Sequence, residues 1–278
     1  MKLSITRAWD ETSAFVKHEA GPLFLIAFGL AVLPGIILQV IVSRLVGSGL
    51  QATPGATPDL APFLSALPVI LLLLIPVLAL SVWGNLTISI LALRREAVIG
   101  SAFRAAARRI LPLAGATLLL VLAAIVMLVP MFAIVGLGSS APRLGLLALL
   151  FFILWLAFVF IAVRLMLMTP VAAAEPVGPL GIVRRSWQLT GGHFWRLLGF
   201  LFLVMLVFLV FALVVTAIGG ILLTLLLGKP DPGTLASLIL QLLTGVLQAV
   251  FVAYFLVLIA RIYAQLSGDA ASVGRVFD

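Results

Sequence analysis

The hydrophobic positions of this chain fall into long, nearly continuous runs that are separated by short polar or basic segments. A helix of about 20 apolar residues rises about 30 Å, the thickness of a bilayer's hydrocarbon core. Backbone in lipid must satisfy its own hydrogen bonds, so runs of this length predict transmembrane helices. Six runs qualify: Gly21–Val46, Phe63–Leu91, Leu111–Gly138, Leu144–Met168, Gly199–Leu227 and Leu235–Leu266. Prolines inside the runs predict kinks, at Pro34, Pro68, Pro76 and Pro130.

Three other segments are apolar on one helical face and polar or basic elsewhere. In each, four residues spaced 4, 3 and 4 apart share a face of an α-helix. The three sets are Ile5, Trp9, Thr12 and Val16; Ile99, Phe103, Ala106 and Ile110; and Val183, Trp187, Thr190 and Phe194. Aromatic side chains are favoured at membrane–water boundaries. We therefore expect Trp9, Phe103 and Trp187 to anchor three amphipathic helices at the membrane interface.

Each amphipathic segment is followed by two apolar runs, which predicts an internal repeat. The expected fold is an all-α integral membrane protein whose six transmembrane helices form three hairpins, each preceded by an interfacial helix. A single membrane domain, 1–278, then contains units of about 1–92, 93–168 and 169–278. Because each unit enters and leaves on one side, the repeats are parallel and their pseudo-symmetry axis follows the membrane normal. The alternative is that any basic linker between two spans acquires such a pattern.

Composition agrees with a membrane protein and excludes several other classes. Of the 278 residues, 64% are hydrophobic and 9% are charged, with a mean hydropathy of +1.35. A soluble domain is about 45–50% apolar and about 25% charged. A disordered chain is excluded as well, because such chains are poor in hydrophobic residues and rich in charge. The absence of cysteine excludes disulfides and thiolate-ligated metals.

The distribution of lysine and arginine predicts the topology. With the N-terminus inside, 14 of the 17 basic residues are cytoplasmic, and Arg44, Arg143 and Lys229 remain outside. This excess inside follows the positive-inside rule, so both termini are expected in the cytoplasm, and a bacterial inner membrane fits best. The net charge of +8 does not indicate nucleic acid as a partner, since the basic residues lie against the membrane on three separate helices.

One stretch resembles a known family. It reads T-P-V-A-A-A-E at 169–175, G-P-L at 178–180 and R-S-W-Q-L-T-x-G-x-x-W-R-L-L at 185–198, and the last run ends in Ile262–Gly268. These segments resemble the membrane domain that some bacterial glycerophosphoryl diester phosphodiesterases carry ahead of their catalytic domain, and which also occurs as stand-alone six-span proteins. The resemblance implies a helical membrane module without hydrolysis, because the phosphodiesterase barrel and its His, Glu and Asp metal ligands are missing from this sequence.

The basic positions on the inner side are the strongest functional signal. Each basic side chain near an anionic leaflet contributes about 1 kcal/mol to lipid attraction. The expected lipid- or partner-binding residues are Arg94, Arg104, Arg108, Arg109, Arg184, Arg185, Trp187 and Arg196. The alternative is that these residues only set the topology.

Acidic and polar residues near or within the spans form a second group. A carboxylate at Glu175, close to the membrane surface, needs a partner. Arg164, Arg184 or Arg185 can supply it, with Glu175–Arg164 as the candidate pair; a headgroup or proton role is the alternative. Asn85, Gln241 and Gln248 are intramembrane polar candidates, and we expect the two glutamines to face inward. They either make interhelical hydrogen bonds, worth about 0.6 kcal/mol on average, or line a polar cavity.

Catalysis is not expected from this chain. Its only histidines, His18 and His193, lack a second ligand at helical spacing, and the acidic residues are scattered. We therefore expect no cofactor and no metal.

The leading hypothesis is a non-enzymatic inner-membrane protein whose basic interfacial helices bind anionic lipid, a partner protein, or both. A transporter or permease subunit for a lipid or amphipathic solute is the alternative, and a lipid-modifying enzyme is the least favoured. The sequence leaves the ligand and oligomeric state open.

Overall fold

The computed structural model describes residues 4–46, 61–94, 98–118, 120–121, 141–230 and 234–277. All regular structure in this part of the chain is helical, as predicted. The elements are α1 (Ile5–His18), α2 (Ala20–Ile26), η1 (Ala27–Val32), α3 (Leu33–Val46), α4 (Ala61–Leu93), α5 (Ile99–Ala107), α7 (Ala141–Leu165), α8 (Met168–Ala174), α9 (Pro179–Thr190), α10 (Phe194–Leu227) and α11 (Leu235–Phe277). Residues 110–118 are also helical.

Five stretches of these helices are long and apolar enough to cross a membrane. They are Ala20–Leu45, Ser65–Leu93, Ala148–Ala174, Phe194–Leu227 and Leu235–Gly268. Each corresponds to one of the predicted runs. The remaining run, Leu111–Gly138, falls mostly outside the described residues, as does Pro130. The five apolar helices are compatible with a multi-pass membrane protein.

A π-helical segment, η1, ends two residues before Pro34, the first of the positions where the sequence predicts a kink. Proline lacks an N–H, and its ring crowds the carbonyl four residues earlier, so the helix widens locally. Ser81 of α4 donates a hydrogen bond to the Ala31 carbonyl in this segment, at 3.3 Å. A neighbouring helix thus satisfies a carbonyl in the widened turn, as helices in lipid require. In contrast, α4 continues through Pro68 and Pro76.

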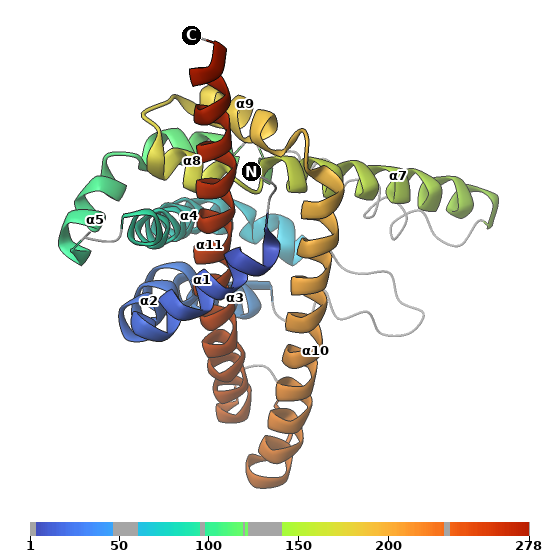
Figure 1. Cartoon of the computed structure of the whole chain (residues 1–278). Coiled ribbons are helices and arrows are strands. Elements are labelled where there is room, and N and C mark those ends of the chain that lie inside the picture. Colours follow the sequence, from blue (N-terminus) through green and yellow to red (C-terminus); the bar gives the residue numbers. More distant parts are fainter. Residues whose placement is uncertain are drawn as a thin grey trace.

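Helix α11 is the central element of the fold. It packs against α1, η1, α4 and α10, and Figure 1 shows it (red) running through the middle of the molecule. Between Leu256 and Tyr263 seven of its eight side chains are buried, on all sides of the helix, which is typical of a core helix. Helix α7, by contrast, projects away from the other helices in Figure 1.

Glycine lets two pairs of long helices approach closely. A Cβ atom on Gly84 of α4 would lie 2.9 Å from Leu30 Cβ, with the backbone of η1 directly behind it. A Cβ on Gly245 of α11 would lie 2.5 Å from Ile36 Cδ1 of α3. Such small-residue contacts drive helix association in membranes, where burial of apolar surface does not.

Two of the predicted amphipathic helices are shorter than their apolar stripes. Helix α5 ends at Ala107 and a turn at Arg108–Arg109 follows, so Ile110 belongs to the next helix. Helix α9 ends at Thr190, and a turn at 191–193 leaves Phe194 as the first residue of α10. Only in α1 do all four residues of the predicted apolar face lie on one helix.

Candidate functional site

The three short helices α1, α5 and α9 each contact a long helix through a pair of small residues. Helix α1 packs on α11, α5 on α4, and α9 on both α7 and α8. In each case one member of the pair directly precedes the predicted aromatic anchor, and the other lies three positions after the anchor. All six are 0% exposed: Ala8 and Thr12, Ala102 and Ala106, and Ser186 and Thr190. Small side chains allow close helix approach, so the same mode of docking occurs three times.

Each predicted anchor contacts an aromatic ring on the long helix beneath it. The ring-centroid distances are 5.0 Å for Trp9–Tyr254, 5.4 Å for Phe103–Trp83 and 5.8 Å for Trp187–Phe160. Trp9 and Trp187 keep 43% and 40% of their surface exposed. Phe103 is more enclosed, and the Trp83 indole N–H donates to its carbonyl at 3.1 Å. Phe103 therefore serves first as a packing residue between α5 and α4.

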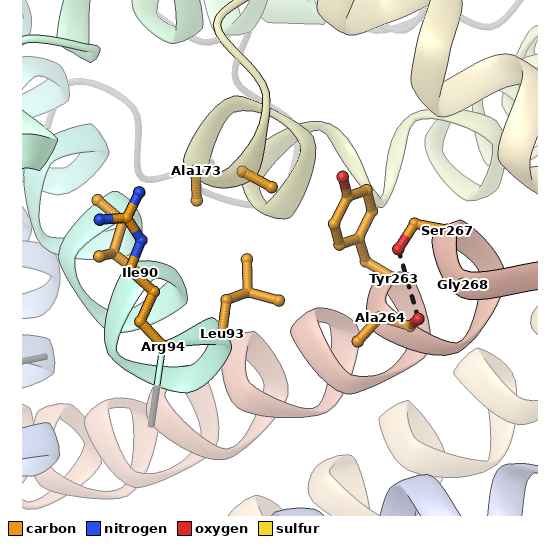
Figure 2. A pocket seen from close by; sticks show the side chains of 9 residues that line it. Ile90, Leu93, Arg94, Ala173, Tyr263, Ala264, Ser267 and Gly268 are labelled. Atoms are coloured by element: carbon orange, nitrogen blue, oxygen red, sulfur yellow. Dashed lines mark hydrogen bonds between the residues drawn. The ribbon is translucent and has the colours of Figure 1, made fainter. Parts of the chain in front are cut away.

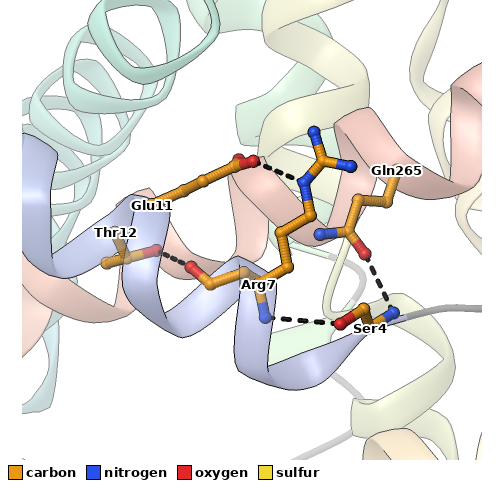
Figure 3. Close-up of polar contacts among 6 residues, drawn as sticks. Ser4, Arg7, Glu11, Thr12 and Gln265 are labelled. Carbon is orange, nitrogen blue, oxygen red and sulfur yellow. Dashed lines mark hydrogen bonds and ion pairs between the residues drawn. The ribbon is translucent and has the colours of Figure 1, made fainter.

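Helix α1 is tied to the late part of α11 at its first turn. The Ser4 backbone N–H donates to Gln265 Oε1 at 3.2 Å, and the Ser4 hydroxyl accepts from the Arg7 N–H at 3.4 Å (Figure 3). The Arg7 and Glu11 side chains form an i,i+4 ion pair at 2.8 Å on the outer face. Further along, the hydroxyls of Ser13 and Tyr254 share a hydrogen bond of 2.9 Å. The chain's first helix is thereby held against its last.

Five of the seven arginines predicted to bind lipid or a partner are exposed: Arg94, Arg104, Arg108, Arg184 and Arg196. No ion pair within the described part of the chain involves any of them. Their charges are therefore available at the surface.

The other two, Arg109 and Arg185, are partly buried, and their side chains bind groups of the protein itself. Arg109 Nη1 donates to the carbonyls of Ala172 and Ala173, at 2.9 Å and 2.7 Å. These carbonyls end α8, a helix whose residues are mostly buried, and helix C-termini need such donors. A cation at that position also interacts favourably with the helix dipole. Arg109 is a cap rather than a surface charge.

Arg185, not Arg164, is the partner of Glu175. Glu175 Oε1 accepts from Arg185 Nε at 3.1 Å and from the Tyr263 hydroxyl at 2.8 Å. The candidate pair Glu175–Arg164 is thus wrong, and one of the alternatives holds. The physical reason is proximity: Glu175 is the residue that directly follows α8, and Arg185 lies on the next helix, α9. Through Tyr263, this carboxylate also connects α8 and α9 to the central helix α11.

Arg164 instead lies among aromatic rings at the end of α7. Its guanidinium carbon is 5.3 Å from the Phe160 centroid, 5.2 Å from Trp187 and 5.6 Å from Phe194. These are cation–π distances. Its backbone carbonyl accepts hydrogen bonds from the hydroxyls of Ser186 at 2.9 Å and Thr190 at 3.1 Å. Both the side chain and the backbone of Arg164 therefore hold α9 against α7.

The intramembrane polar candidates lie in different surroundings. Asn85 Oδ1 and Gln241 Oε1 are buried and accept no hydrogen bond from a described residue. Gln248 is exposed, which corrects the prediction that both glutamines face inward. The buried stripe of α11 is centred on Gly245 and Ala249, because small residues permit the closest packing, and Gln248 lies outside it. The two glutamines therefore do not form a common inward face.

An open cavity of about 440 Å³ lies beside the Glu175 contact, between the ends of α4, α8 and α11. Figure 2 shows Arg94 and Tyr263 on opposite walls, with Leu93 between them. The Ser267 hydroxyl on the far wall donates to the Ala264 carbonyl at 3.4 Å. Arg94 is the charged residue of this cavity and is exposed.

The two histidines are in separate places. His18 contacts Glu19 at 2.9 Å on an exposed surface, and His193 lines a cavity between α7 and α10. Within the described ranges, no group of three His, Cys, Asp or Glu residues is placed to hold a metal ion.

Comparison with known proteins identifies the family but not an activity. A family model described as a domain of unknown function (DUF7847) matches residues 22–266. The chain belongs to this family. No curated protein and no solved structure matches the chain. The matched residues include α5 and α9, whereas α1 precedes them.

Sequence reasoning missed several residues of these contacts. Tyr263 lies 88 positions from Glu175, and no local pattern connects them. Ala8, Ala102 and Ser186 were missed because a hydrophobic stripe is weighted toward large side chains, whereas the docking positions are small. Their common position, one residue before each aromatic anchor, is the signal that would have revealed them.

Proposed function

We propose that this chain is a non-enzymatic protein of the bacterial inner membrane whose short basic helices bind anionic lipid headgroups at the cytoplasmic face. The observation that carries the proposal is the threefold docking of α1, α5 and α9, combined with the exposed arginines on two of these helices. The resemblance of residues 169–198 to the membrane domain of phosphodiesterases supports a membrane module of this kind.

The geometry of a helix relates the arginines to the docking face. At 3.6 residues per turn, Arg104 and Arg184 lie roughly 140–180° around their helices from the buried small pairs, and Arg108 follows directly at the end of α5. The aromatic anchors lie roughly 80° from those pairs, at the side. A helix that rests on the bundle through its small pair, with its aromatic ring at the side, then presents its arginines outward, at the level of the lipid headgroups.

The contacts also support the proposed threefold repeat of six spans in three hairpins. Helix α5 docks on α4, the last described span of the proposed first unit, and α9 docks on α7, the last span of the second. Helix α1 docks on α11, the last span of the third. Each short helix thus contacts the unit before it, and the third unit contacts the first. This cyclic order is what a pseudo-threefold axis along the membrane normal requires.

Lipid composition around the protein tests the proposal. In nanodiscs of equal parts phosphatidylglycerol and phosphatidylcholine, we expect phosphatidylglycerol to be enriched among the lipids that native mass spectrometry detects with the protein. Replacement of Arg104, Arg108 and Arg184 by glutamine is expected to reduce this preference, since each charge contributes about 1 kcal/mol, or about fivefold in affinity.

The matched control is Lys229→Gln, which removes one exposed charge from the predicted outer side. This variant should keep the wild-type enrichment. Equal enrichment for the wild type and the triple variant would contradict the proposal. In that case, a partner that binds the wild type and not the triple variant would assign the arginines to protein recognition.

A further inference from the structure

A second cavity, of about 820 Å³, lies where α7, the 191–193 turn and the start of α10 meet. This volume is in the range of small-molecule sites. Its polar wall contains Arg164, His193 and Arg196, and its apolar wall contains Leu156, Phe160 and Leu198. Trp195, at the same junction, is 80% exposed. The cavity therefore brings cations together with apolar side chains.

Arg164 gives this cavity a specific chemistry. Three rings lie within cation–π distance of its guanidinium, the residue is partly buried, and its Nε is enclosed with no acceptor among the described residues. A partly buried cation whose ring contacts supply no hydrogen-bond acceptor favours an anionic acceptor at the part of its guanidinium that lines the cavity. Gly191 makes room for this arrangement, since a Cβ there would lie 3.3 Å from Arg164 Nη1. Arg196 adds an exposed second positive charge.

Beyond the cavity, exposed apolar side chains follow on each of the two helices. On α7 the exposed side chains Leu149, Phe152 and Leu156 follow one face down from Phe160. On α10, Phe202 and Leu206 are exposed in the same way. An occupant that matches both the arginines and the apolar side chains carries an anionic headgroup and long apolar chains. A phospholipid has this chemistry, whereas a free phosphate or sugar phosphate leaves the apolar wall uncovered.

We propose that the cavity between α7 and α10 binds one anionic phospholipid, with its phosphate at Arg164 and Arg196 and its acyl chains along α7 and α10. This site is separate from the exposed arginines of α5 and α9. It rests on the proposed function only in placing the start of α10 at the level of the lipid headgroups.

The test measures calorimetric binding to delipidated protein in an uncharged detergent. The probe is dioctanoyl phosphatidylglycerol, and glycerol 3-phosphate serves as the same phosphate chemistry without acyl chains. Gly192 lines the cavity, and a Cβ there meets nothing within 4 Å. Gly192→Leu therefore adds a bulky side chain to the cavity lining with no clash at its Cβ. Its matched control is Gly199→Leu, a second position with nothing within 4 Å, on α10 outside the cavity.

We expect the wild type and Gly199→Leu to bind the short-chain lipid alike, and Gly192→Leu and Arg196→Gln to bind it about tenfold or more weakly. Glycerol 3-phosphate should not bind measurably. Unchanged binding by Gly192→Leu overturns the proposal, as does equal binding of dioctanoyl phosphatidylcholine or of glycerol 3-phosphate. The triple variant at Arg104, Arg108 and Arg184 should bind the probe like the wild type. If the triple variant loses the nanodisc enrichment but still binds the probe, the two proposals are tested independently of each other.

Discussion

Replacing Arg109 with methionine is expected to destabilise the protein by about 2–4 kcal/mol. The substitution removes both hydrogen bonds to the end of α8 while keeping an apolar side chain in the same space. Hydrogen bonds from charged groups contribute about 1.5–3 kcal/mol each, and buried carbonyls without donors carry a further cost. In detergent, the unfolding temperature followed by tryptophan fluorescence should fall by about 5–10 °C.

The neighbouring residue supplies the control for this experiment. Arg108 has the same charge and lies in the same turn, but its side chain is exposed. Arg108→Met should therefore change stability by no more than about 0.5 kcal/mol. If the two variants lose the same stability, the lost charge alone is responsible and Arg109 is not a cap of α8.

Enlarging a docking residue of α5 should loosen that helix from α4. Ala106 is 0% exposed, and leucine at this position adds three carbon atoms to a closely packed contact. Overpacking of this kind costs about 1–3 kcal/mol. We expect Ala106→Leu to speed amide hydrogen exchange across residues 99–107, since the displaced helix also loses the contact between Phe103 and Trp83.

Ala107→Leu is the control, because Ala107 is the next residue of the same helix and is exposed. Alanine and leucine are both strong helix formers, so the effect on helix propensity is small and equal in the two variants. Slow exchange in both variants would contradict the docking of α5 through its small residues. Fast exchange in both would show that α5 responds to added bulk on any face.

The sequence predicted the helical, span-rich character of the fold because a single physical requirement produces it. Backbone in lipid must be helical or part of a closed barrel, so apolar runs such as Phe194–Leu227 are recognisable without tertiary information. Helix ends were less predictable. The break at 191–193 separates two helices whose apolar positions remain in phase, and periodicity alone does not detect such a turn.

The candidate site was predictable only in part. Exposed arginines such as Arg104 and Arg184 could be identified from their positions opposite an apolar face. The roles of Arg109, Arg164 and Arg185 could not, because all three carry the same charge and their partners lie on other helices or turns. Which arginine caps a helix, stacks on rings or pairs with Glu175 depends on tertiary distances of a few ångströms. The cavity between α7 and α10 could not be predicted either, because it also depends on tertiary distances.

The central claim is that α1, α5 and α9 lie on one face of the membrane, and labelling of single cysteines tests it most directly. The chain has no cysteine of its own, so each introduced thiol is unique. We predict that Asp10→Cys, Ala107→Cys and Gln188→Cys react with a membrane-impermeant maleimide in inside-out vesicles and not in intact spheroplasts. Lys229→Cys should show the opposite pattern. Labelling of any one of the first three in intact spheroplasts would contradict the account.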